Sequence, residues 1–515
     1  MNNEIVLRVR SLSKIFPGTL ALKNVNMNFR YAKIHGIIGK NGAGKSTFVN
    51  ILSGILSPSW GKIVLNGKEF ISLSPPTLAK KEGITIVTQN IEIVPDFNLV
   101  QNLYLPYYRE TKIKILKLKE MKIEAEKIFK QVGFNVDLNR KMSDLTLSEK
   151  QIFLILKAFY IDKAEVVILD EVTSSFSKRE QEFFYDLLKK QKNMNKSIIF
   201  ISHRMDEVLD ICDRISVIRD GEVVGSFERG KVNNELLCSM IVGKTKYNHS
   251  FESSTFSEKK NKQDVKNQHG IQIMSIEGFT RKGCFYNINM NLRKGEILGV
   301  AGLVGSGRTE ILKAIAGIEP PDEGWINLEK RKKIRFFSKS WKAINNGIIY
   351  LTEDRDEEGI INTMSVLKNL SLSYIVHILK GLLIKIREEK NLAKKLIKDF
   401  EILTSSLDED IQNLSGGNRQ RVLCARVAST EANILLLDEP TKGIDIESKS
   451  SLLRVIREKL RMSAGIIITS PGIEDLLTIC DRIIILFEGR IIDEYKRKDF
   501  NELDIYRAMQ GLNIR

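Results

Sequence analysis

A glycine-rich segment near the start of the chain has the residues needed to bind a triphosphate. It matches the pattern G-x-x-x-x-G-K-[S/T] and reads Gly39-Lys40-Asn41-Gly42-Ala43-Gly44-Lys45-Ser46-Thr47. Glycines let backbone N–H groups turn inward around phosphates, and Lys45 brings a positive charge to the β- and γ-phosphates. The Ser46 hydroxyl is placed to bind Mg²⁺, and a helix expected from about residue 48 adds its positive N-terminal dipole. The segment therefore predicts an ATP site.

Two acidic residues farther along the chain supply the metal ligand and the base that such a site needs. Asp170 and Glu171 follow the apolar run 166–169, so their carboxylates are expected at the carboxyl edge of a sheet. Asp170 is the predicted metal ligand, and Glu171 is predicted to polarise the attacking water. An acidic pair that only caps a helix is the alternative. The same pair recurs as Asp438-Glu439 after another apolar run, which favours catalysis.

Two further polar residues stand after apolar runs that are typical of strands. His203 follows the run 197–201 and is predicted to contact the γ-phosphate and orient the water, although a lone histidine is more often structural. Gln89 follows the run 84–88 and is a candidate metal ligand and water sensor at a hinge. The predicted catalytic residues are thus Glu171, His203 and Gln89. The predicted metal ligands are Ser46, Gln89 and Asp170.

A second glycine-rich segment departs from the first at its key position. It reads Gly302-Leu303-Val304-Gly305-Ser306-Gly307-Arg308-Thr309-Glu310, with Arg308 in the place of the loop lysine. Arginine keeps the charge but is bulkier and forked, so we expect it to hold phosphate while misplacing the γ group. Asp438 and Glu439 are both present downstream, so ATP binding at this degenerate site remains open. Its expected role is regulatory or structural.

Another motif, which we call the signature motif, is intact in the second copy and altered in the first. The second copy reads Leu414-Ser415-Gly416-Gly417-Asn418-Arg419-Gln420, whereas the first reads Leu145-Thr146-Leu147-Ser148-Glu149-Lys150-Gln151 and lacks the glycine pair. Small residues and free N–H groups at a helix that begins near Asn418 can grip a γ-phosphate from outside. If the two halves meet face to face, Ser415, Gly416 and Gly417 complete the site at Lys45. The chain would then build one good ATP site and one poor one.

The spacing of these motifs indicates a duplicated domain. Gly39 and Gly302 are 263 residues apart, and Asp170 and Asp438 are 268 apart. The apolar runs predict strands of a mainly parallel α/β core in each copy, into which a mostly helical subdomain is inserted at about 95–150 in the first. We predict domains at residues 1–247 and 269–515, joined by a polar, solvated linker at 248–268.

Composition narrows the class of protein. The 515 residues carry a formal charge of +16, but basic and acidic residues are interspersed, so no nucleic-acid partner is expected. Five cysteines lie far apart without a C-x-x-C pair, which argues against zinc and for reduced thiols in a cytoplasmic protein. No signal peptide is visible, and no apolar stretch is long enough to span a membrane.

In this order, the motifs resemble those of the ATP-binding cassette (ABC) ATPases, over nearly the whole chain. Within that superfamily the second glycine-rich segment, Glu353-Asp354-Arg355 and the second signature are similar to those of double-cassette ATPases of bacterial importers for monosaccharides of the ribose, galactose and xylose type. The resemblance implies an α/β fold of two tandem P-loop NTPase domains. It also implies an ATP-hydrolysing, energy-coupling subunit at the cytoplasmic face of the membrane. Importers of nucleosides or autoinducers are relatives and form the alternative.

The same resemblance implies partners and further site residues. The region after Gln89 and the inserted helices would receive a coupling helix from a separate integral membrane permease. A periplasmic or lipoprotein sugar-binding protein would deliver the solute. Phe16 would stack on adenine, unless it is simply a core phenylalanine, with Phe279 as a weaker counterpart. The degenerate site would comprise Gly302, Gly305, Gly307, Arg308, Thr309, Glu353, Asp438 and Glu439.

Three departures from the family pattern are visible. Val172 stands where proline is usual, Glu353 stands where glutamine is usual, and the second copy has no histidine at the position of His203. Glu353 would place a like charge near phosphates unless Mg²⁺ intervenes. A soluble tandem cassette protein that acts on ribosomes is the rival class. The degenerate second loop and the short linker argue against it.

Overall fold

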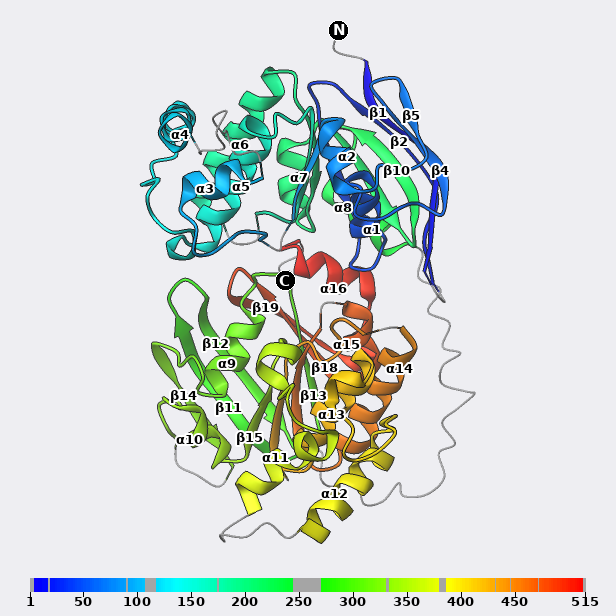
Figure 1. Cartoon of the computed structure of the whole chain (residues 1–515). Helices are drawn as coiled ribbons and strands as arrows, with labels where there is room; N and C mark the ends of the chain where they lie inside the picture. Colours follow the sequence, from blue (N-terminus) through cyan, green and yellow to red (C-terminus); the bar gives the residue numbers. More distant parts are fainter. Residues whose placement is uncertain are drawn as a thin grey trace. The chain divides into compact units, whose positions relative to one another are not determined.

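The computed structural model divides the chain into two compact units, Met1–Lys244 and Thr245–Arg515 (Figure 1), and we describe each by itself. The residues described are 4–16, 19–88, 91–106, 117–173, 176–243, 270–329, 333–378, 386–430, 432–444, 446–470 and 472–512. The predicted linker at 248–268 lies outside these ranges. No helix in the described part of the chain combines the length and the apolar character needed to cross a bilayer.

The first unit contains two sheets. A four-stranded antiparallel sheet has the order β2-β1-β4-β5, and a six-stranded sheet has the order β10-β9-β3-β8-β7-β6. Every neighbouring pair in the second sheet is parallel except β9 and β10, which confirms the predicted, mainly parallel core. The strands are β1 (Ile5–Phe16), β2 (Thr19–Arg30), β3 (Ile34–Ile38), β4 (Trp60–Leu65), β5 (Lys68–Phe70), β6 (Ile84–Val87), β7 (Val166–Asp170), β8 (Ser197–Ile201), β9 (Arg214–Arg219) and β10 (Glu222–Glu228).

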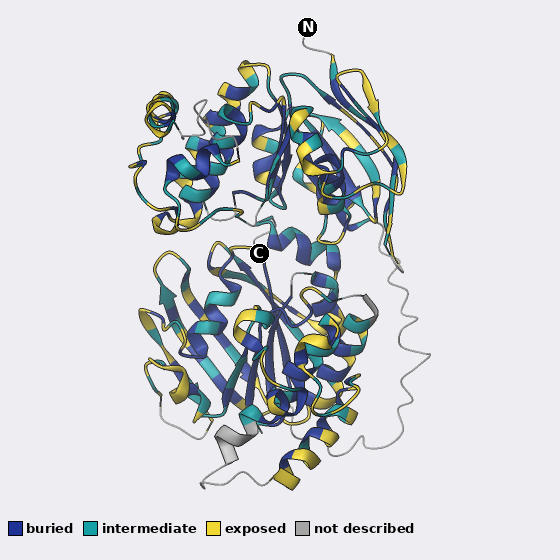
Figure 2. Cartoon of the chain, viewed as in Figure 1, coloured by how far each residue is buried: buried dark blue, intermediate teal, exposed yellow. Residues whose placement is uncertain are grey.

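Continuous apolar sequence explains the parallel strands at the centre of this unit. Every residue of β3 and β8 is buried, as is every residue of β7 except its last, Asp170 (Figure 2). Such strands are covered on both faces, so they carry no polar alternation. The predicted strands at 34–38, 166–169 and 197–201 are therefore confirmed. Asp170 is the first side chain of β7 to emerge from the core.

The helices of the first unit fall into two groups. Those that belong to the core are α1 (Lys45–Leu52), α2 (Pro76–Lys81), α6 (Lys178–Asn193), α7 (Met205–Ile211) and α8 (Asn234–Val242). A second group, α3 (Leu99–Tyr104), α4 (Leu118–Val132) and α5 (Leu147–Tyr160), gathers on the side away from the antiparallel sheet in Figure 1. This group is the predicted helical subdomain, except that α5 continues past residue 150 because apolar residues extend to Tyr160.

The second unit repeats this plan. Its sheets have the orders β12-β11-β14 and β15-β16-β17-β13-β18-β19, and in the larger one only β18 and β19 are antiparallel. The strands are β11 (Gln272–Arg281), β12 (Phe285–Arg293), β13 (Ile297–Ala301), β14 (Glu323–Leu328), β15 (Ile348–Leu351), β16 (Ile434–Leu437), β17 (Gly465–Thr469), β18 (Arg482–Phe487) and β19 (Arg490–Lys496). The helices are α9 (Arg308–Ile315), α10 (Ser340–Ile344), α11 (Val366–Ile378), α12 (Ile386–Asp399), α13 (Gly416–Ala428), α14 (Ile446–Val455), α15 (Ile473–Ile479) and α16 (Glu502–Met509).

Two helices begin earlier than the sequence indicates. Helix α1 begins at Lys45 because Gly44, at φ 103°, ends the loop in a conformation that favours glycine. Helix α13 begins at Gly416, since the Ser415 side chain accepts a hydrogen bond from the Asn418 backbone as an N-cap. The predicted starts near residues 48 and 418 were therefore two to three residues late.

Candidate functional site

The carboxyl edge of the parallel sheet gathers the predicted site residues of the first unit. Strand β8 lies between β3 and β7, and its last residue, Ile201, is in register with Ile37 and with Asp170. The loops that leave these three strands therefore start at one edge of the sheet. They carry the glycine-rich segment, the acidic pair and His203.

Close backbone packing explains two glycines of the phosphate loop. A Cβ atom on Gly44 would lie 2.6 Å from the Ala21 carbonyl oxygen, and one on Gly39 would lie 2.2 Å from that of Ile218. The Ala43 carbonyl also accepts a hydrogen bond from the Gly221 N–H at 3.1 Å. These contacts fix the loop against strand β2 and the β9–β10 hairpin. The backbone of the loop is therefore held in place by its neighbours.

Lys45 is held inside this loop. Its Nζ donates hydrogen bonds to the carbonyl oxygens of Gly39 (2.7 Å) and Lys40 (2.9 Å), and the residue is 6% exposed. Burial lowers the pKa of Lys45, although the charges of Glu171 and Asp170 act to raise it. Ser46, next on α1, is exposed. The loop thus presents a positive charge and a solvent-accessible hydroxyl.

The two acidic residues have different environments although they are adjacent. Burial, followed by the charge of Glu171, raises the pKa of Asp170 to about 6, against the opposing charge of Lys45. Burial also acts to raise the pKa of Glu171, but the hydrogen bond and charge of His203, with Lys45, bring it below its usual value. Glu171 therefore stays ionised to a lower pH than Asp170 does, and a general base must be ionised to accept a proton.

Glu171 and His203 form a pair. Their atoms Oε2 and Nδ1 are 3.6 Å apart, and the Glu171 backbone N–H donates to the Ile201 carbonyl at 3.0 Å. Glu171 has a φ of 53°, a conformation that residues other than glycine rarely adopt and that is common at functional sites. The predicted neighbours of the acidic pair are thus brought together on the side of the sheet where Lys45 lies.

For two other predicted site residues, Phe16 and Gln89, the expected role stays a prediction. Phe16 is half-buried at the end of β1, with Lys14 Nζ 5.2 Å from its ring centre, so adenine stacking stays a prediction. Gln89 lies outside the described residues. Its neighbour Thr88 accepts a hydrogen bond at its carbonyl from Gln151 Nε2 on α5 at 3.2 Å. That bond joins the helical subdomain to the end of β6.

In the second unit the loop arginine is used internally. The Arg308 guanidinium donates to the Ser470 carbonyl at 2.7 Å and to Glu439 Oε1 at 3.0 Å, and both charged side chains are buried. Burial raises the pKa of Glu439, and the charge of Arg308 opposes that shift. The sequence predicts that Arg308 holds phosphate. The structure adds a competing partner, a buried carboxylate 131 residues away.

Asp438 is equally occupied. Its Oδ1 accepts hydrogen bonds from Thr469 (2.6 Å) and Thr309 (3.2 Å), and its Oδ2 accepts one from Tyr350 (2.9 Å). Burial nevertheless raises the pKa of this fully buried carboxyl group. Glu353, which the sequence placed as a like charge near phosphates, forms an ion pair with Lys442. The degenerate site is therefore largely satisfied by its own side chains.

The intact signature motif opens α13. The Ser415 hydroxyl caps the helix, and Asn418 Nδ2 donates to it at 3.1 Å. Arg355 donates to the Gly416 carbonyl at 3.0 Å and pairs with Asp356, which in turn pairs with Arg419. The sequence singled out Arg355 only as part of a family-like motif. Its contact with the signature backbone joins two segments 61 residues apart.

The other signature helix, α5, begins with a different chemistry. Thr146 and Glu149 form a capping box, in which Glu149 Oε2 accepts from the Thr146 N–H at 2.8 Å. Leu147 stands at the position of Gly416 and is 58% exposed. A carboxylate and a leucine at a helix N-terminus disfavour an incoming phosphate by charge and by bulk. The defect expected from the sequence is therefore also a defect in geometry.

One expectation about adenine is wrong. Phe279 is fully buried, so its ring cannot reach a nucleotide. A Cβ atom on Gly324 would lie 2.6 Å from the Phe279 ring, which shows how tightly strands β11 and β14 pack around it. Phe279 is a core residue.

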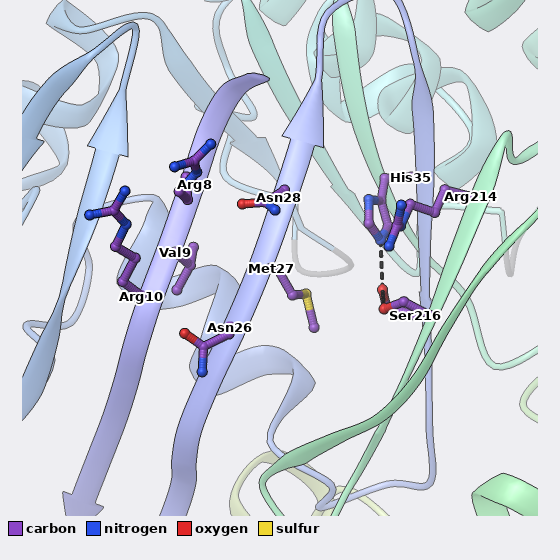
Figure 3. Close-up of a pocket in the computed structure, with 10 residues that line it drawn as sticks. Arg8, Val9, Arg10, Asn26, Met27, Asn28, His35, Arg214 and Ser216 are labelled. Atoms are coloured by element: carbon purple, nitrogen blue, oxygen red, sulfur yellow. Dashed lines mark hydrogen bonds between the residues drawn. The ribbon is translucent and has the colours of Figure 1, made fainter. Parts of the chain in front are cut away.

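A separate pocket of about 420 Å³ lies among β1, β2, β3, β9 and β10 (Figure 3). His35 at this pocket is hydrogen-bonded through Nε2 to Ser216 Oγ at 2.8 Å. Burial, then the charges of Arg214 and Arg30, lowers the pKa of His35 to about 3, so it stays neutral. The pocket shares no residue with the predicted site. It is lined by Arg8, Val9, Arg10, Asn26, Met27, Asn28, His35, Arg214, Ser216 and Ser226.

A glycine-rich loop, an acidic pair at the carboxyl edge of a parallel sheet and a signature helix, each present twice, define a tandem cassette ATPase. A family model described as ABC transporter matches residues 22–174 and 285–442. The chain belongs to the ABC transporter family.

Named relatives are similar over the whole chain. The ribose import ATP-binding protein RbsA 2 of Rhizobium meliloti (strain 1021) is 32% identical over 513 residues, which cover 99% of this chain and 97% of that protein. The ribose import ATP-binding protein RbsA of Geobacillus kaustophilus (strain HTA426) is 33% identical, with 99% and 100% covered. A solved nucleotide-free ATP-binding cassette from an ABC transporter is 22% identical at a TM-score of 0.40, with 44% of this chain and 92% of that one covered.

Proposed function

We propose that the chain is the ATP-hydrolysing, energy-coupling subunit of an importer for a simple sugar. One observation carries the ATPase part: Lys45, Asp170, Glu171 and His203 share one edge of the sheet, with Glu171 and His203 3.6 Å apart. The sugar comes from the relatives, whose names give ribose import.

In the proposed mechanism, the loop of residues 39–47 holds the phosphates of ATP, and Phe16 stacks on the adenine. Glu171 accepts a proton from the attacking water, and His203 orients that water towards the γ-phosphate. Lys45 and the loop N–H groups stabilise the charge that develops on the phosphate oxygens. Gln89 would sense the metal and the water from the end of β6.

The residues at this edge fit Mg²⁺. The Ser46 hydroxyl and the Asp170 carboxylate are hard oxygen donors of the kind that this ion prefers. Among the described residues, no side chain donates a hydrogen bond to Asp170, in contrast to the three that Asp438 accepts. When bound, Mg²⁺ would neutralise negative charge on the phosphate groups. Ser46 and Asp170, with Gln89, would hold it.

We further propose that Ser415, Gly416 and Gly417 complete the site at Lys45 from the second cassette. The degenerate site, made of Gly302, Gly305, Gly307, Arg308, Thr309, Glu353, Asp438 and Glu439, is then structural or regulatory. The cassettes would comprise residues 1–247 and 269–515 with a linker at 248–268. The chain would work at the cytoplasmic face of the membrane with separate permease subunits, to which a sugar-binding protein delivers the solute.

The catalytic proposal is tested by a matched pair of variants. Glu171→Gln should lower ATP hydrolysis by the full chain about a hundredfold or more while ATP binding is kept, because the base is lost but the loop is not. Glu439→Gln should change the rate by less than about threefold, since this carboxylate is bound to Arg308. Equal losses in the two variants would contradict the assignment of the active site to the first unit.

The transport proposal is tested by what co-purifies with the chain. The Glu171→Gln variant, trapped with ATP and extracted gently from native membranes, should bring down a membrane protein with several spans, identified by mass. A solute-binding protein encoded with that permease could then be titrated with simple sugars, nucleosides and autoinducers. Ribosomal proteins without a membrane partner would overturn the importer in favour of a translation-linked protein.

A further inference from the structure

A buried carboxylate lies behind the Glu171–His203 pair. Glu207, on α7, is 1% exposed. Its Oε2 accepts hydrogen bonds from Thr173 Oγ1 at 2.8 Å and from Ser202 Oγ at 2.7 Å. Both hydroxyls are themselves buried. One oxygen atom thus joins two loops that leave different strands, β7 and β8.

Those two loops carry the two members of the pair. Thr173 follows Glu171 by two residues, and Ser202 directly precedes His203. The backbone bond from Glu171 to Ile201 is at the sheet edge, so beyond it the loops are free to diverge. Glu207 holds them together past that point. The Glu207 carboxylate is therefore a direct link between the loop that carries Glu171 and the loop that carries His203.

The other oxygen of Glu207 is also held. Oε1 accepts a hydrogen bond from Gln181 Nε2 at 2.9 Å and lies 3.6 Å from Arg204 Nε. The four groups that contact the carboxylate here are therefore donors. An amide in its place would turn an N–H₂ group towards donors at one of the two positions. An amide of nearly the same size would therefore disturb contacts that the carboxylate makes.

The second unit contains the same arrangement 268 residues later. Asp475 Oδ2 accepts from Thr441 Oγ1 at 2.8 Å and from Ser470 Oγ at 2.6 Å, and Lys449 pairs with its Oδ1 at 2.7 Å. Aspartate therefore suffices to join two such hydroxyls in this fold. The second unit has no histidine after Ser470. The second unit therefore provides a control, in which a carboxylate accepts hydrogen bonds from the same two hydroxyl positions but no Glu–His pair follows from the sequence.

We propose that Glu207 is a positioning residue that sets the geometry of Glu171 and His203 through Thr173 and Ser202. This inference rests on the proposed ATP hydrolysis at the first unit. Glu207 touches neither the nucleotide nor the attacking water in this scheme. It acts by keeping base and histidine at the separation that aligns one water molecule, since small misplacements of catalytic groups are costly.

The test compares Glu207→Gln with Asp475→Asn in the full chain. Glu207→Gln should lower kcat for ATP hydrolysis about tenfold to a hundredfold while KM for ATP changes less than about threefold, because the loop that binds phosphates is untouched. The two variants should lower the midpoint of denaturant unfolding to a similar degree. Asp475→Asn should nevertheless leave kcat within about twofold of the value for the unaltered chain. Glu207→Asp should recover most of kcat, as the aspartate of the second unit indicates.

Each result decides between this inference and its rivals. If both amide variants lose stability and neither loses kcat, Glu207 is structural and the inference fails. If KM rises in step with the loss of kcat, the residue supports binding and the inference also fails. Glu171→Gln and His203→Ala are measured alongside. If neither of them reduces hydrolysis, the proposed active site itself is wrong, whatever Glu207→Gln does.

Discussion

The two glycine-rich loops of this chain end in glycines of similar backbone conformation, but the cationic side chains that follow have different hydrogen-bond partners. Gly44 and Gly307 precede their helices at φ 103° and 102°. Lys45 Nζ donates to two carbonyl oxygens of its own loop, whereas Arg308 donates to a buried glutamate. The first loop keeps its acidic pair available for a metal and a water. In the second, Arg308 pairs with Glu439, while Asp438 accepts hydrogen bonds from hydroxyl groups. The forked side chain of Arg308 reaches a carboxylate as well as a backbone carbonyl.

The two signature helices differ in the reverse sense. Helix α13 starts with Ser415 and two glycines, while α5 starts with a capping box whose acceptor is the Glu149 carboxylate. Each unit therefore retains the half that the other lacks. The two units are therefore complementary in their phosphate loops and signature helices. The following substitutions and a pH dependence test this difference between the units.

The largest effect is expected from Ser415→Arg. An arginine at this N-cap would fill the space offered to a γ-phosphate, so hydrolysis should fall about a thousandfold although the change lies in the second unit. Thr146→Arg, at the equivalent position in α5, should change the rate less than about threefold. Steady-state hydrolysis by the full chain measures both. An unaltered rate in Ser415→Arg would mean that the site at Lys45 is complete without the second cassette.

A smaller effect is expected from Arg308→Met. Loss of the guanidinium leaves Glu439 buried without its hydrogen-bonded cation, which should cost the second unit about 3 kcal/mol. Lys45→Met removes hydrogen bonds to two backbone carbonyls and should cost the first unit about 1 kcal/mol. Hydrogen exchange of peptides from each unit separates the two stabilities. If Arg308→Met were the milder of the two, the second loop would not be held by its ion pair.

The smallest effect concerns pH. The pKa of Asp170, raised to about 6, means that this carboxyl group gains a proton as pH falls through that value and loses its affinity for Mg²⁺. The Mg²⁺ concentration for half-maximal hydrolysis should rise about tenfold per pH unit below 6 and level off above it. Asp170→Asn is the control, in which the dependence should vanish. A flat Mg²⁺ requirement in the unaltered chain would remove Asp170 from the metal site.

Motif spacing was sufficient to predict the parallel strands and the neighbours of the acidic pair. Glycine loops and acidic residues after apolar runs obey local rules, so Lys45, Asp170 and His203 could be placed at one sheet edge. Contacts between distant segments obey no such rule. The partners of Arg308, of Arg355 and of Glu207 lie 131, 61 and up to 34 residues away, and only the fold brings them within bonding distance. Phe279 shows the converse error, because an aromatic residue at an equivalent position proved to be core.

The ion pair between Arg308 and Glu439 has a consequence for how the chain responds to the energy state of a cell. Under the proposed function, and with the degenerate site in a structural role, a loop that carries its own counter-ion would keep its shape whether ATP is scarce or abundant, and the loop at Lys45 would respond to nucleotide supply. Under the proposed function, the rate of the chain then follows the occupancy of one loop and rises with ATP along a simple hyperbola, without a threshold. Solute uptake would decline in proportion to that occupancy as ATP falls, and would not stop abruptly.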